Sequence, residues 1–117
     1  MILETRSILF SDDELIVALK PILEAKGMDA ATIPHDVRAH LNDEGEVAIR
    51  YDMPNGQNPV VFNSREVGAA ILNHCIEQGV PLPRGSKKEL DIRGEHLALI
   101  VRLESGLQGS DIDPGEE

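Results

Sequence analysis

The side chains best suited to bind a soft metal ion or to act as nucleophiles are four histidines and one cysteine, namely His35, His40, His74, His96 and Cys75. His74 and Cys75 are neighbours on an expected helix, where successive side chains point about 100° apart, so they do not converge on one ion. His35 and His40 are five positions apart, not the three or four that place two ligands on one helical face. The spacing therefore predicts no metal site, and we expect no cofactor.

His74 and Cys75 are also the best-placed candidates for a base and a nucleophile. An enzyme of unrecognised type that uses them is the third functional hypothesis. Cys75 is expected in the middle of a helix, on its apolar stripe and away from any helix N-terminus that would lower the thiol pKa. A buried structural thiol explains its position more simply, and no residue is assigned as catalytic.

The densest group of carboxylates is Asp12-Asp13-Glu14. Carboxylates in this number could bind Mg²⁺ or Ca²⁺. They also occupy the first turn of an expected helix, where the helix dipole favours negative charge. The pattern therefore indicates the start of a helix and not a cation site.

A basic cluster near the C-terminal half offers an anion site as the second functional hypothesis. Its members are Arg84, Lys87, Lys88 and Arg93, with His74 as a further lining residue. Such a cluster would suit a small ligand or an anion, although a solvated connector has the same composition. Nucleic acid is not expected as a partner, because the chain has a net charge of −10 and repels phosphate backbones.

The composition favours a small folded domain with an aliphatic core. The 117 residues are 41% hydrophobic, but they include no Trp, one Tyr and two Phe. The single cysteine excludes an internal disulfide and suits a reducing compartment. No secretory signal or apolar membrane span is visible, so we expect a soluble cytoplasmic protein without a membrane partner.

The elements that must position these residues include one helix start that occurs twice. Ser11 and Asn63 are good N-caps, and Glu14 and Glu66 follow them at the third helical position, where each can bond back to the cap N–H. A phenylalanine precedes each cap and can pack onto an apolar residue one turn into the helix; the two pairs are Phe10 with Leu15 and Phe62 with Val67. The repetition predicts two similar halves, which arose either by duplication or by convergence.

The first half is predicted to contain a strand over 6–10 and a helix over about 12–26. Pro21 either kinks this helix or begins a second short one. One or two helical turns are predicted over 35–41, because Val37 and Leu41 would share one side. The alternating residues 46–53 predict a strand that forms a hairpin with 60–62.

The second half is predicted to contain a helix over 64–78 and an extended connector at Pro81-Leu82-Pro83. A hairpin follows, with strands at 90–92 and 96–103. Leu97 to Val101 is apolar on both faces and predicts a central strand. Residues 104–117 are acidic and rich in glycine, so a disordered tail is expected there.

These elements predict an α+β fold with two main helices and an antiparallel or mixed sheet. We expect a single domain over 1–103 with similar halves at about 6–53 and 59–103. The order β-α-β-β-α-β also fits a ferredoxin-like arrangement with pseudo-two-fold halves.

The leading functional hypothesis is a non-catalytic protein–protein interaction or regulatory module that forms a homodimer. It is based on the absence of a convergent ligand set or cofactor motif in the sequence, and on a small sheet with exposed edges that need cover. Few aromatic anchors predict a dimer of micromolar strength or weaker. The identity of a protein partner does not follow from the sequence.

Overall fold

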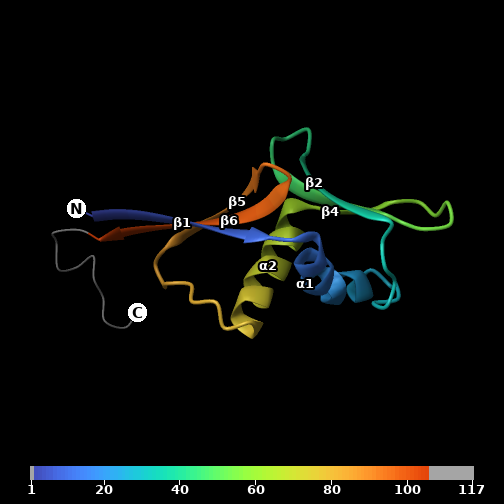
Figure 1. Cartoon of the computed structure of the whole chain (residues 1–117), viewed down its shortest axis with the longest axis horizontal. Helices are drawn as coiled ribbons and strands as arrows, with labels where there is room; N and C mark the ends of the chain where they lie inside the picture. The colour runs from blue at the N-terminus through green and yellow to red at the C-terminus, as the bar shows by residue number, and fades with distance from the viewer. Residues whose placement is uncertain (1, 106–117) are drawn as a thin grey trace.

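The computed structural model describes residues 2–105 and consists of two helices and six strands (Figure 1). In the first part of the chain, strand β1 (Ile2–Phe10) leads into helix α1 (Asp12–Ala25), followed by strands β2 (Asp36–Leu41) and β3 (Val47–Asp52). The second part repeats this order with β4 (Val60–Phe62), α2 (Ser64–Glu77), β5 (Lys87–Arg93) and β6 (His96–Ser105). In residues 2–105 no helix is long and apolar enough to cross a lipid bilayer.

The strands form two antiparallel sheets of three strands, in the orders β1-β6-β5 and β2-β3-β4. The α+β class with two main helices is confirmed. The strands do not join into the single sheet of a ferredoxin-like domain, because the first strand of each part pairs with the hairpin of the other part. Phe10 is opposite Leu97 in the first sheet, and Phe62 is opposite Ile49 in the second.

The prediction of helical turns over 35–41 is wrong, because this segment is strand β2. Val37 and Leu41 fit a helical spacing, but Val37, Ala39 and Leu41 also alternate as a strand requires. Pairing with β3 decides between the two, with Val37 opposite Tyr51 and Leu41 opposite Val47. Other strands are longer than predicted: β1 begins at Ile2 and β5 at Lys87.

Both predicted helices form, but their N-termini differ in one respect. The side chain of Asn63 accepts a hydrogen bond from the Glu66 N–H, and the Glu66 carboxylate accepts one from the Asn63 N–H, each at 2.9 Å. Ser11 caps α1 by accepting from the Glu14 N–H at 3.3 Å. The Glu14 carboxylate, however, does not close the capping box, because it bonds to His74 of α2. Helix α1 runs without a break through Pro21, so no second helix begins there.

Two ion pairs connect the helices at opposite ends. Glu14 in the first turn of α1 lies 2.5 Å from His74 in the last turn of α2, measured from Oε2 to Nε2. At the other end, Lys26 at the C-cap of α1 lies 2.8 Å from Glu66 in the first turn of α2. The two helices are therefore antiparallel, and the equivalent glutamate of each helix contacts the end of the other.

The core lies between the helices and the inner faces of the sheets, and it is mostly aliphatic as predicted. Tyr51 and Phe62 are its aromatic members besides Phe10, and their rings meet edge to face at 5.0 Å. The Lys26 ammonium lies 5.6 Å from the centre of the Phe62 ring. Strand β6 is central in its sheet, and Leu97 to Val101 are buried on both faces, as their apolar run predicted.

The two strands β1 and β6 continue past the helices as a two-stranded ladder, on the left of Figure 1. This ladder contains Glu104 and Ser105, which were predicted to belong to the disordered tail. The rest of that predicted tail, 106–117, lies outside the described residues.

We expect the salt bridge between Lys26 and Glu66 to make the free energy of unfolding depend on pH. Burial raises the pKa of Glu66, but the hydrogen bonds from Lys26 and the Asn63 N–H, with the charge of Lys26, lower this pKa below its ordinary value. A carboxyl with a lowered pKa stabilises the fold above its unfolded pKa of about 4.3, and this contribution is lost as the pH falls through the folded value.

Glu66→Gln should therefore lower the free energy of unfolding by about 0.5–1 kcal/mol at pH 7, and by progressively less below about pH 4. Urea titrations at several pH values measure this difference. Glu24→Gln, at an exposed position of α1, is the matched control and should change stability little at any pH. A difference for Glu66→Gln that stays constant down to pH 3 would contradict the assignment.

Candidate functional site

The basic residues predicted to bind an anion do not form one cluster. Lys87 and Arg93 are at opposite ends of β5, which separates them by roughly 20 Å along the strand. Arg84 is exposed in the loop before β5. Side chains alternate along a strand, so Lys88 lies on the opposite face of the sheet from Lys87 and Arg93.

Two of these basic residues already have partners. The Arg93 Nε donates to Asp91 Oδ2 at 2.8 Å. The pKa of Asp91 is lowered by the Ile92 N–H and by Arg93, which keeps the carboxylate ionised and the pair neutral. Lys88 is half-buried, and its Nζ donates to the carbonyls of Ser86 at 3.1 Å and Pro83 at 3.5 Å. Lys88 therefore orders the loop before β5.

His74 was predicted as a lining residue of that anion site or as a catalytic base. Its side chain is buried and bonds through Nε2 to the Glu14 carboxylate of α1. The carboxylate accepts, so Nε2 carries the proton in this arrangement. His74 thus connects the two helices instead of facing the loop that holds Arg84.

Cys75 is a free thiol with no exposed surface in the core, as expected for a structural cysteine. Burial raises the pKa of the thiol, which opposes formation of the nucleophilic thiolate. His74 and Cys75 are both buried, but the imidazole is directed to Glu14, so the structure does not show the pair that the enzyme hypothesis requires.

We therefore predict slow labelling of Cys75 by a thiol reagent such as DTNB in the native state. The rate at neutral pH should be at least about 10³-fold lower than in denaturant, because the reagent reaches the thiol only when the core opens. The absorbance of the released thiolate measures both rates. Native labelling within tenfold of the denatured rate would contradict burial and strengthen the nucleophile hypothesis.

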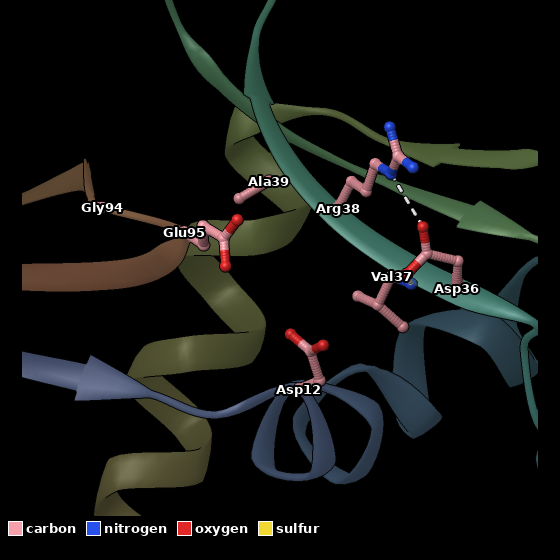
Figure 2. A pocket seen from close by; sticks show the side chains of 7 residues that line it. All are labelled: Asp12, Asp36, Val37, Arg38, Ala39, Gly94 and Glu95. Atoms are coloured by element: carbon pink, nitrogen blue, oxygen red, sulfur yellow. Dashed lines mark hydrogen bonds and ion pairs between the residues drawn. The ribbon is translucent and has the colours of Figure 1, made fainter.

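One cavity lies between the edge of β2, the start of α1 and the turn between β5 and β6 (Figure 2). It measures about 510 Å³ and is lined by Asp12, Asp36, Val37, Arg38, Ala39, Gly94 and Glu95. Figure 2 shows the carboxylates of Asp12 and Glu95 directed into it, while the Arg38 guanidinium turns away. The Arg38 Nε donates to Asp36 at 2.7 Å, and this bond lowers the pKa of that carboxyl.

A second cavity, of about 430 Å³, occupies the corresponding place in the other part of the chain. It lies between the start of α2, at Asn63 to Arg65, and the turn between β2 and β3, at Asn42 to Glu46. In both places the strand before the helix pairs with a hairpin, and the helix begins beside the turn of that hairpin. Strand β1 pairs with the β5–β6 hairpin beside α1, and β4 pairs with the β2–β3 hairpin beside α2. The two polar hollows are thus a result of the repeated topology, since each contains residues of a helix start and of a hairpin turn.

A more apolar hollow than these two is a groove on the outer side of α1, which we call the α1 groove. It measures about 470 Å³ and is lined by Asp13, Ile16, Val17 and Lys20 of α1 and by Ala30, Ala31, Thr32 and Ile33 of the following loop. The four helical residues have the spacing of one face, separate from the face of Leu15, Ala18 and Leu19 that packs into the core. Val17 is 48% exposed and Ile33 is 74% exposed.

The loop wall of the α1 groove is ordered by hydrogen bonds. Asp29 accepts from the Ala31 N–H through its carboxylate at 2.9 Å and from the Thr32 N–H through its carbonyl at 3.0 Å. This surface was not predicted from the sequence, although the spacing of Ile16 and Val17 opposite the core face was a usable signal.

No cluster of three or more His, Cys, Asp or Glu side chains suited to a metal ion occurs in the described part of the chain, residues 2–105. No family model, curated protein or solved structure matches this chain.

Proposed function

We propose that the protein is a non-catalytic protein–protein interaction module that binds an apolar segment of a partner protein in the α1 groove. The observation that carries this proposal is the pairing of Val17 and Ile33, two large apolar side chains exposed on opposite walls of one groove. Exposed apolar surface that is concave and bordered by charge is typical of sites that receive another protein.

The charges at the groove define the kind of segment that fits. Asp13 and Lys20 line its helical wall with opposite signs, and each lies one helical turn from Ile16 and Val17, on either side of them. A short amphipathic segment with one or two aliphatic side chains, a basic residue toward Asp13 and an acidic residue toward Lys20 would match it. The groove is too small for an extensive interface, so we expect weak, reversible binding.

The alternative of an anion or small-ligand site has less support. Its basic residues are distributed over β5, both faces of the sheet and the preceding loop, and the cavity beside β2 is lined by three carboxylates and one paired arginine. These groups repel an anion.

Site-specific photocrosslinking in the source organism tests the proposal. A photoreactive phenylalanine analogue at position 17 or 33 should yield a crosslinked product of one defined mass, because both positions face the groove. Ile76 is the matched control, since it is 71% exposed on the other helix.

A Val17→Asp substitution should remove the product formed from position 33, since it places an unpaired charge in the groove. Equal crosslinking from position 76, or no product from positions 17 and 33, would contradict a role for the groove. The melting temperature of each variant shows that the fold is retained.

A further inference from the structure

Strand β1 is an edge strand with a long free side. It pairs with β6 on one side, and its sheet order is β1-β6-β5, so the other side of its nine residues has no strand in the described fold. The backbone N–H and C=O groups of such an edge can pair with another chain. Leu3 and Leu9, on the face of β1 away from the core, are 69% and 55% exposed.

The charges on β1 are arranged so that the strand complements itself. Glu4 and Arg6 are two positions apart and therefore point to the same face, and both are exposed, opposite Leu103 and Val101 of β6. We propose that two copies of the chain pair through β1, antiparallel and centred on Thr5. In this register Glu4 of each copy is opposite Arg6 of the other copy.

The register centred on Thr5 is more favourable than the two adjacent registers. Moving the centre of the pair by one residue shifts the partner of every residue by two positions. Because side chains alternate, the two core faces then stay on the same side of the joined sheet. Centring the pair on Arg6 places two arginines opposite each other, and centring it on Glu4 places two glutamates opposite each other. Opposite charges across a strand pair are favourable and like charges are not, so pairing centred on Thr5 is the arrangement with two ion pairs.

Apolar contacts on the outer face agree with the same register. Leu3 of one copy is opposite Ser7 of the other and diagonal to its Leu9, within reach of long side chains. Two exposed leucines on each copy thus gain apolar neighbours. The helices of each copy lie toward the C-terminal end of its β1, so in an antiparallel pair they are at opposite ends and leave the junction open (Figure 1).

The resulting dimer has one two-fold axis through the Thr5 pair and a continuous six-stranded sheet. Such closed two-fold pairing is the commonest form of association for small proteins. The surface is separate from the α1 groove, so this inference does not depend on the proposed function.

Sedimentation of the full chain over a wide concentration range, at low salt, tests the interface. We expect the wild type to dimerise with a Kd of roughly micromolar order, because the interface contains no aromatic anchor. Glu4→Arg should weaken the dimer by at least about tenfold, because it replaces two ion pairs with two like-charge contacts, and Arg6→Glu should do the same. Both side chains are exposed, so the melting temperatures at low protein concentration should match the wild type.

Two combinations make the test specific for this register. The double variant Glu4→Arg with Arg6→Glu restores opposite charges and should return the Kd to within about threefold of the wild type. Mixing the two single variants should yield a heterodimer, because two arginines on one β1 then face two glutamates on the other. A wild type that is monomeric up to about 1 mM, single variants that dimerise unchanged, or absence of both the rescue and the heterodimer would each overturn the proposal.

Discussion

Replacing Phe62 with alanine is expected to lower the free energy of unfolding by about 4 kcal/mol, the largest effect of any single substitution that we predict. Phe62 has no exposed surface, packs edge to face against Tyr51 and lies beneath the ammonium of Lys26. Its removal leaves a cavity beside Tyr51 in the core, and a change of this size is a large fraction of the stability of a small domain.

Chemical denaturation followed by circular dichroism measures this loss, and two further variants make it interpretable. Phe62→Leu keeps most of the volume and should cost roughly half as much. Val61→Ala, at the exposed neighbouring position, should change stability by less than about 1 kcal/mol. A loss below about 1 kcal/mol for Phe62→Ala would mean that the ring is not part of the core.

Removing the Glu14 carboxylate with Glu14→Ala is expected to cost about 2 kcal/mol. The reason is the asymmetry of the pair: Glu14 is half exposed and can be hydrated when it loses its partner, whereas His74 is buried and would keep an unsatisfied N–H. Glu14→Gln should cost less than about 1 kcal/mol, because the amide oxygen still accepts from Nε2.

A double-mutant cycle with His74→Ala isolates the bond from other effects of each substitution. The coupling energy should be about 1–2 kcal/mol, and the stability of all four proteins can be measured by the same urea titration. Asp13→Ala is the control for general loss of negative charge in the first turn of α1. A coupling energy near zero would show that His74 and Glu14 do not depend on each other in solution.

The parts of the fold that the sequence predicted well are those set by local interactions. The two helix starts were predicted from a cap, an acidic residue at the third position and a preceding phenylalanine, and the structure shows Ser11 and Asn63 as N-caps. Turn residues between β3 and β4 predicted the hairpin that connects the two parts. Caps and tight turns involve residues close in sequence, so their spacing is visible there.

The parts that were predicted wrongly depend on partners that are distant in sequence. Residues 35–41 satisfy a helical and a strand pattern equally, and only the β3 partner decides. The role of Glu14 likewise depends on His74, which local capping rules do not include. The division of the strands into two sheets follows from the pairing of β1 with β6, the two ends of the described chain.

The candidate sites show the same limit. The predicted anion site consisted of basic residues close in sequence, namely Arg84, Lys87, Lys88 and Arg93. An extended strand places Lys87 and Arg93 far apart and directs Lys88 to the other face of the sheet, so these residues do not form a cluster. The α1 groove instead requires a loop that returns along a helix: the spacing of Ile16 and Val17 indicated its helical wall, but Ala30 and Ile33 of the loop wall belong to no periodic segment.

The exchange of first strands between the two parts of the chain has a consequence for biosynthesis. Among the described strands, β1 leaves the ribosome first and its partner β6 leaves last. During translation β1 therefore remains unpaired, with Ile8, Leu9 and Phe10 exposed, until β6 is synthesised. Strands β2, β3 and β4 can form their sheet before that. Because pairing between distant segments is slow, β1 is exposed to aggregation and to chaperone binding for longer than the strands of the second sheet.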